Sequence, residues 1–304
     1  PFAKLVIAVF IALTSFLFVF IAGMLLAVPL FDIQLSHLPT IMNNLAETDH
    51  ISLLKYVQMI QSIGFFVVPP FVIAWFYSRS NSRYLKLNRS SSFQSFILVA
   101  FLILASLPLV NYLAEINSRL TFPESLQEVE NWMKDKEAYA KELTEVFIQA
   151  GSFQAYLVNL LIMALIPAFG EELLFRGVFQ RLFSEWTKNI HWGIILSAIL
   201  FSILHLQFYG FLPRMLLGVL FGYLLVWSNS IWLPMLAHFI NNAFAVSAYY
   251  FFSEEVVSQQ IDQIGTQESQ FPVLILSLVI VGLIIWYLRK RVLATNIRYY
   301  EYEI

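Results

Sequence analysis

The chain contains no cysteine, and only 12% of its 304 residues are charged. The lack of cysteine excludes disulfide bonds, thiolate metal ligands and a cysteine nucleophile, so any chemistry depends on oxygen and nitrogen groups. The formal net charge of −2 gives no reason to expect nucleic acid as a partner. Hydrophobic residues make up 59% of the chain, a share that is too high for a soluble globular protein of this length.

Most of the sequence consists of long apolar runs. They predict an all-α fold, a polytopic transmembrane helix bundle of about eight spans, because each run is roughly 17 to 25 residues long. The first run is longer than the apolar region of a signal peptide and has no clear cleavage site, so we expect it to be retained. The eight expected spans cover approximately 5–30, 52–77, 93–113, 155–183, 192–209, 211–228, 231–252 and 272–288.

The loops between the runs differ in charge. The segment 78–92 carries four basic residues and no acidic one, and the positive-inside rule therefore places it in the cytoplasm. The segments 32–50 and 253–271 carry acidic residues without Lys or Arg, and alternation of the spans places both outside. Both termini are then expected in the cytoplasm.

The longest hydrophilic insertion, 114–153, has eight acidic residues against four basic ones and is expected outside. Its apolar residues recur at near-helical spacing, which predicts an amphipathic helix on the membrane surface or over the bundle. Such a helix is either a lid or a solvated connector with one buried face. The chain thus divides into an N-terminal three-span region with this insertion (1–153), a four-helix core (154–252), and an external loop, last span and basic tail (253–304).

Three charged residues interrupt the fourth run. Glu171, Glu172 and Arg176 lie in an otherwise apolar stretch, and charge in that setting is costly and usually functional. One helical turn separates Glu172 from Arg176, so the two can neutralise each other on one face. Glu171 points about 100° away and has no such partner, which makes it the candidate general base.

Two further helices of the core carry polar residues. Glu171 lies about as far before the expected turn at 188–189 as His205 lies after it, roughly 25 Å along each helix, so the two are expected to face one another. His238 and Asn242 share one face of a third helix, although His238 lies nearer to its own turn. Each alone is explained as a hydrogen-bond partner between helices. Together they indicate a cavity with a shared task.

The three motifs resemble those of a known family. Over about 155–250 the sequence resembles the CAAX protease and bacteriocin-processing family, also called the Abi family, of intramembrane endopeptidases. The form Glu-Glu-Leu-Leu-Phe-Arg-Gly is closer to the prokaryotic branch than to the eukaryotic Ras-converting enzyme, which implies a bacterial or archaeal cell membrane. The motifs read Glu171-Glu172-x-x-x-Arg176, Phe201-x-x-x-His205 and His238-x-x-x-Asn242.

The resemblance implies a role for each motif residue. Glu171 and His205 activate a water molecule, His238 and Asn242 stabilise the oxyanion, and a supporting ion pair joins the remaining Glu and Arg. Neither a metal ion nor another cofactor is implied. The substrates are membrane-associated or CAAX-like C-terminal peptides or proteins, which enter from the cytoplasm or from the lipid.

Three alternatives stay open at this point. Two His and a carboxylate can form a catalytic zinc site, although the sequence has no His-Glu-x-x-His helix. A proton-coupled transporter also uses buried Glu and His, and it is expected to show symmetrically repeated discontinuous spans. A non-proteolytic member of the same family would act as a scaffold or as an immunity protein.

Overall fold

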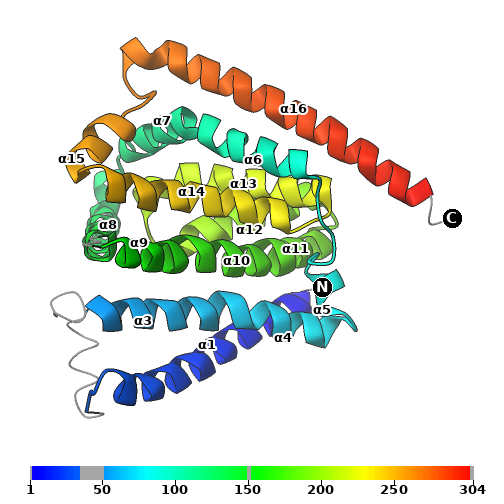
Figure 1. Cartoon of the computed structure of the whole chain (residues 1–304), viewed down its shortest axis with the longest axis horizontal. Helices are drawn as coiled ribbons and strands as arrows, with labels where there is room; N and C mark the ends of the chain where they lie inside the picture. The colour runs from blue at the N-terminus through cyan, green and yellow to red at the C-terminus, as the bar shows by residue number, and fades with distance from the viewer. Residues whose placement is uncertain (1, 35–50, 149–151, 302–304) are drawn as a thin grey trace.

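The structure is a computed structural model that describes residues 2–34, 51–148 and 152–301, with side chains described as far as residue 290. The described residues contain helices and no strands, and Figure 1 shows the helices gathered into one bundle with α1 and α16 on opposite flanks. The prediction of an all-α helical bundle is confirmed.

Each of the eight apolar runs is helical. Several are divided by bends or by wider turns into successive segments. Their bounds are α1 (Phe2–Leu30), α3 (Ile51–Ser62) with α4 (Val68–Tyr77), α6 (Phe93–Ala105) with α7 (Leu107–Ser118), α9 (Phe153–Asn159) with α10 (Ile166–Glu172) and α11 (Gln180–Thr187), α12 (Ile190–Leu204), α13 (Phe211–Ser228), α14 (Trp232–Phe251) and α16 (Phe271–Glu301). Between them lie α5 (Asn81–Tyr84), α8 (Gln127–Ile148) and α15 (Glu254–Val256).

Fewer helices meet the requirements for crossing a membrane than the eight that the sequence predicts. Within the described residues, five are long and apolar enough, or six if the pair α6 and α7, bent by 42°, forms one span. The core helix α12 has only 15 residues, about 22 Å at 1.5 Å per residue. The core helix α14 is longer, but His238, Asn241 and Asn242 lower its hydropathy. The two exceptions are therefore one core helix that is short and one that carries several polar residues.

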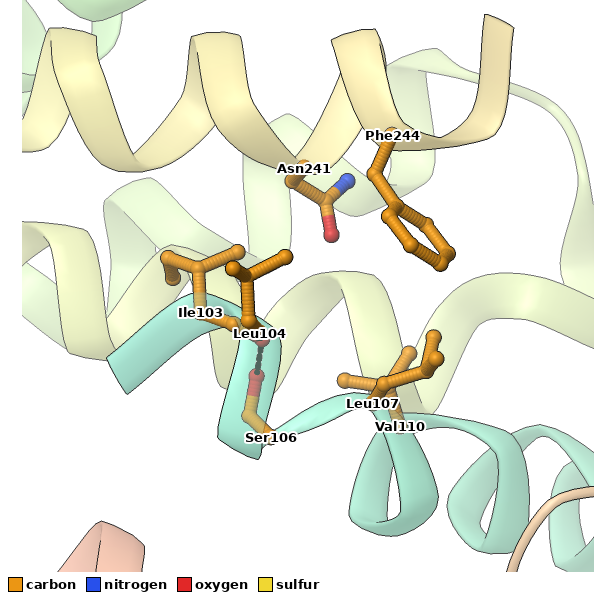
Figure 2. Close-up of a pocket in the computed structure, with 7 residues that line it drawn as sticks. All are labelled: Ile103, Leu104, Ser106, Leu107, Val110, Asn241 and Phe244. Atoms are coloured by element: carbon orange, nitrogen blue, oxygen red, sulfur yellow. Dashed lines mark hydrogen bonds between the residues drawn. The ribbon is translucent and has the colours of Figure 1, made fainter. Parts of the chain in front are cut away.

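The bend between α6 and α7 faces α14. The Ser106 hydroxyl donates a hydrogen bond to the Ile103 carbonyl at 2.7 Å, which satisfies an acceptor where the helix is interrupted. Figure 2 shows Asn241 and Phe244 projecting from α14 toward this bend, around a cavity of about 30 Å³. That volume is about the share of one water molecule in the liquid, so this space is a packing defect rather than a substrate site.

The basic and the acidic connecting segments lie at opposite ends of the bundle. Figure 1 shows α5, which belongs to the basic 78–92 segment, at one end and α8 and α15 at the other. This separation agrees with a charge difference across a membrane but does not give the orientation, which stays a prediction. Of the predicted external segment 32–50, residues 35–50 lie outside the described part of the chain.

The helix with the two glutamates is bordered by wider turns. The segments Leu160–Leu165 and Leu173–Phe179, before and after α10, have π-helical geometry. This geometry is rare in proteins overall, and where it occurs it is often at a functional site. Gly170 allows α10 to approach the preceding hairpin, because a Cβ atom there would lie 2.9 Å from side-chain atoms of Phe66 and of Val67. The two glutamates are thereby fixed in the middle of the bundle.

The predicted amphipathic helix of the insertion is α8, and it lies across one end of the bundle (Figure 1). Met133 is buried, and the ring of Trp132 lies 5.3 Å from that of Phe208. The Glu137 carboxylate accepts a hydrogen bond from the Tyr209 backbone N–H at 3.3 Å. These contacts fix α8 to the turn that follows α12.

Candidate functional site

Glu172 lies at the centre of the polar cluster. Its Oε1 atom is 2.6 Å from Nη1 of Arg176 and 2.8 Å from Nδ1 of His238. The Glu172 and Arg176 side chains are 0% and 1% exposed. The i,i+4 spacing anticipates the first contact. The second, which joins α14 to α10, has no local sequence signal, and through it Glu172 orients His238 as well as neutralising Arg176.

Arg176 is enclosed by groups that suit a buried cation. Its Nη2 atom donates to the Gly218 carbonyl at 3.3 Å, and the guanidinium carbon lies 4.7 Å and 5.3 Å from the ring centroids of Phe201 and Phe221. A Cβ atom at Gly218 would lie 3.2 Å from Nη2. The absence of a side chain at Gly218 therefore leaves room for the guanidinium.

Glu171 has a different environment from its neighbour. It is 8% exposed, and no hydrogen bond among the described residues involves its carboxylate, although Oε2 is buried as it is in Glu172. Its ion-pair contact is with His238, whose Nε2 atom is 3.8 Å away. Because Nδ1 of His238 is directed at the Glu172 carboxylate, the free nitrogen of the same ring is the one that faces Glu171.

His205 ends α12 beside this cluster. Its Nδ1 atom lies 2.8 Å from the Phe201 carbonyl oxygen, which can only accept, so Nδ1 carries the proton and Nε2 of the neutral ring has a free lone pair. In the described part of the chain, no hydrogen bond or ion pair joins His205 to Glu171. The Phe201 ring contacts both imidazoles, at 4.7 Å from His205 and 5.9 Å from His238.

Asn242 lies one turn beyond His238 and faces the fourth run. Its Nδ2 atom donates to the Met163 carbonyl at 3.1 Å, and its Oδ1 atom accepts from Asn241 at 3.2 Å. These two bonds fix the orientation of the amide. One of the two Nδ2 hydrogens is left for another acceptor.

The depth of His238 has a structural cause that the sequence does not reveal. The turn before α14 is held by the basic segment: the Ile231 N–H donates to the Lys86 carbonyl at 3.4 Å, and the Ser230 hydroxyl donates to the Arg89 carbonyl at 2.7 Å. Counted from their turns, His238 and Glu171 differ by about ten residues, or roughly 15 Å of helix. The hairpin of α11 and α12 therefore projects beyond the start of α14, and the two residues meet.

Arg214 is a site residue that the sequence analysis missed. Its guanidinium donates to the carbonyl and to the side-chain oxygen of Gln207, at 3.1 Å and 2.9 Å. It interacts electrostatically with Glu171, His205 and Glu137. The available signal was a single Arg within the sixth apolar run.

A cavity of about 470 Å³ lies beneath α8, and we call it the vestibule. Its wall is formed by one face of α8, by Gln207 and by the last turn of α14. Because Gln207 also holds Arg214, the vestibule adjoins the polar cluster.

The described residues contain no group of three His, Asp or Glu side chains that is arranged to hold a metal ion. Instead, the two glutamates share their surroundings with two guanidinium groups and two imidazoles. This arrangement can hold a water molecule and move a proton, and it can donate hydrogen bonds to a developing negative charge.

Comparison with known proteins identifies a family to which the core is similar. Residues 153–244 match the model of the family described as "Type II CAAX prenyl endopeptidase Rce1-like", which confirms the resemblance over that segment. The "Uncharacterized protein YpbD" of Bacillus subtilis (strain 168) is 30% identical over 89 residues, which are 28% of this chain and 42% of YpbD. No solved structure matches the chain. The family is one of proteases, and with its long apolar helices the chain is an integral membrane protein.

Proposed function

We propose that this protein is an intramembrane endopeptidase that hydrolyses peptide bonds by means of an activated water molecule. The observation that carries the proposal is the contrast between two adjacent carboxylates. Oε1 of Glu172 accepts two hydrogen bonds, whereas no hydrogen bond in the described structure involves the Glu171 carboxylate; Oε2 of each residue is buried without a hydrogen-bond partner. A buried carboxylate oxygen without a partner is costly, and a substrate water is the group that would satisfy it.

The water is activated by Glu171 with help from His205. Glu171 takes one proton from the water molecule as the water oxygen attacks the peptide carbonyl carbon. The free lone pair on Nε2 of His205 accepts a hydrogen bond from the second O–H and so orients the water. The tetrahedral intermediate then collapses. The C–N bond breaks, and Glu171 delivers its proton to the leaving amine, so no covalent acyl-enzyme forms.

His238 and Asn242 are proposed to stabilise the oxyanion. Nδ1 of His238 donates to the Glu172 carboxylate, and in the imidazolium form of the ring Nε2 is a second donor, which faces the reacting carbonyl. Asn242 contributes its remaining Nδ2 hydrogen. Loss of one such donor typically costs about 3 to 4 kcal/mol of transition-state stabilisation.

The substrate is proposed to reach Glu171 through the vestibule. Arg214 connects the vestibule with the catalytic carboxylate, because it is bound by Gln207, which lines the vestibule, and interacts electrostatically with Glu171. Entry from the end covered by α8, or laterally from the lipid, is therefore favoured over entry from the basic end, which the sequence had suggested. Prenylated and unprenylated CAAX-like C-terminal peptides both belong in the test.

The experiment is a cleavage assay with the full chain purified in detergent. A panel of membrane-associated and CAAX-like C-terminal peptides is incubated with the wild type and with Glu171→Gln, and products are identified by mass spectrometry. We expect cleavage by the wild type and a loss of at least about 10³-fold in kcat with Glu171→Gln. The matched control is Glu142→Gln on the exposed face of α8, which is expected to leave cleavage unchanged.

The other functions predict different results in the same assay. A scaffold or immunity protein leaves every peptide intact but still binds its partner, and that binding survives Glu171→Gln. A proton-coupled transporter moves solute in proteoliposomes and releases no peptide fragments. Equal cleavage by the wild type and by Glu171→Gln would assign the activity to a contaminant or to another residue.

A further inference from the structure

A second large cavity lies at the end of the bundle opposite to α8. It has a volume of about 540 Å³ and lies between the turn around α5, the hairpin of α11 and α12, and the end of α13. Arg176 and Gly177 form part of its wall. The proposed peptidase reaction uses no other group in this cavity, which we call the basal cavity.

The wall of the basal cavity is rich in cations. Lys86 and Arg181 line it together with one acid, Glu185, which is 3.2 Å from Arg181 and also 3.0 Å from Lys4. Burial, followed by the charges of Arg181 and Arg89, lowers the pKa of Lys86. The cavity thus concentrates more positive charge than its single carboxylate balances, and an anion would relieve that repulsion.

Two buried polar atoms from residues that line the cavity lack a hydrogen-bond partner among the described residues. They are Oη of Tyr84, a residue 5% exposed, and Oε1 of Gln180, a residue 2% exposed. Burial raises the pKa of Tyr84 to about 12, so its hydroxyl keeps its proton and is a donor. Tyr84 therefore offers the site a donor for an anion, whereas Oε1 of Gln180 faces α13, where a Cβ atom at Gly222 would lie 2.7 Å from it.

Tryptophan side chains place the basal cavity at the level of lipid head groups. Five exposed tryptophans lie toward this end of the bundle, four of them near helix ends and one within α16, and rings of this kind collect at the interface between membrane and water. Only one other exposed tryptophan, Trp132 on α8, lies at the opposite end among the described residues. The five are Trp75, Trp186, Trp192, Trp232 and Trp286.

We propose that the basal cavity is a binding site for the head group of an anionic glycerophospholipid. Lys86 and Arg181 contact its phosphate, and the Tyr84 hydroxyl donates a hydrogen bond to a phosphate oxygen. Basic pockets between membrane helices bind anionic head groups in this way. Since Arg176 lines the same cavity, the lipid lies directly beneath the ion pair that orients His238.

The test measures the thermal stability of the delipidated full chain in detergent as short-chain phosphatidylglycerol, phosphatidylcholine or inorganic phosphate is added. A ligand that binds only the folded state raises the melting temperature in proportion to its occupancy. We expect phosphatidylglycerol to raise it at far lower concentration than the other two. Lys86→Gln with Arg181→Gln should weaken the apparent affinity roughly 10- to 100-fold.

Two further variants keep the test decisive. Arg79→Gln with Arg83→Gln removes the same charge from exposed positions of the same segment and is expected to leave the affinity within about twofold, as for surface charges. Tyr84→Phe keeps both cations and removes only the hydroxyl, and it should weaken binding roughly 3- to 10-fold. If Lys86→Gln with Arg181→Gln does not fold, Tyr84→Phe alone tests whether the cavity binds the lipid.

Three results would overturn the proposal. The first is an equal loss of affinity in the two double variants, because that would indicate general surface attraction. The second is equal stabilisation by phosphatidylcholine and phosphatidylglycerol. The third is saturation by inorganic phosphate at the concentration at which phosphatidylglycerol acts, since that would assign the site to a free anion rather than a lipid.

Discussion

Replacing each of the two adjacent glutamates by glutamine should separate stability from catalysis. In Glu172→Gln the Arg176 guanidinium, 1% exposed, loses its anionic partner at 2.6 Å, and His238 loses its partner at 2.8 Å. Removal of one member of a buried ion pair typically costs about 3 to 5 kcal/mol, because the other charge is left uncompensated. In Glu171→Gln no hydrogen bond seen in the described structure is lost.

The expected magnitude for Glu172→Gln lies toward the lower end of that range. Arg176 keeps its bond to the Gly218 carbonyl and its contacts with two aromatic rings, and a desolvated cation–π contact is worth about 2 kcal/mol. A loss of about 3 kcal/mol corresponds to a melting temperature roughly 6 to 12 °C lower, at 2 to 4 °C per kcal/mol. Glu171→Gln should melt within a few degrees of the wild type, or above it.

Thermal melting in detergent and peptide cleavage are measured on the same preparations. Glu171→Gln is expected to melt normally and to lack cleavage, whereas Glu172→Gln is destabilised. Adding Arg176→Met to Glu172→Gln removes the orphaned charge and should recover much of the loss, since apolar replacements of buried ion pairs are often neutral. Equal melting of the two single variants, or no recovery in the double variant, would refute this account.

Other outcomes follow from the same structure. Gly218→Ala should lower the melting temperature by several degrees, because the new Cβ atom would lie 3.2 Å from Arg176 and overpacking costs about 1 to 3 kcal/mol. The control is Gly282→Ala, because a Cβ atom there would meet nothing within 4 Å. Cleavage should survive dialysis against a strong chelator, and loss of activity restored by added zinc would favour the metalloprotease alternative. A cysteine at Ser82 should resist an impermeant thiol reagent in intact cells while one at Ser125 reacts, and the reverse labelling pattern would invert the predicted topology.

The helices and the positions of the polar motifs follow from local sequence. Apolar runs specify helices because each must bury its backbone in lipid or protein, and all eight runs are helical. The contact between Glu172 and Arg176 depends only on helical spacing. Which helices are long and apolar enough to cross a membrane was less predictable. The helix α12 is too short. A helix packed among other helices, such as α14, can carry polar residues that a lipid-facing helix cannot.

The meeting of His238 with the two glutamates depends on register between helices, which no local pattern encodes. The register of α14 is set by carbonyls of the basic segment, which cap the turn at Ser230 and Ile231. That segment is hydrophilic in sequence, yet Tyr84 and Leu85 are 5% and 0% exposed. Burial of these two side chains thus holds the charged loop between the helices. The position of α14 along its axis follows from this, and His238 lies beside Glu172.

This dependence links the basic segment to the catalytic cluster in a way that can be measured. If Leu85 holds the segment in place, Leu85→Ala should cost about 2 to 5 kcal/mol and should also loosen the turn before α14. His238 would then be less well fixed against Glu172. Cleavage by Leu85→Ala should therefore fall at temperatures well below the melting temperature of that variant. The control is Leu182→Ala, because Leu182 is also buried, at 1% exposure, but does not belong to the basic segment. This control should lose stability without the early loss of activity. Parallel behaviour of the two variants would show that the register of α14 is fixed elsewhere.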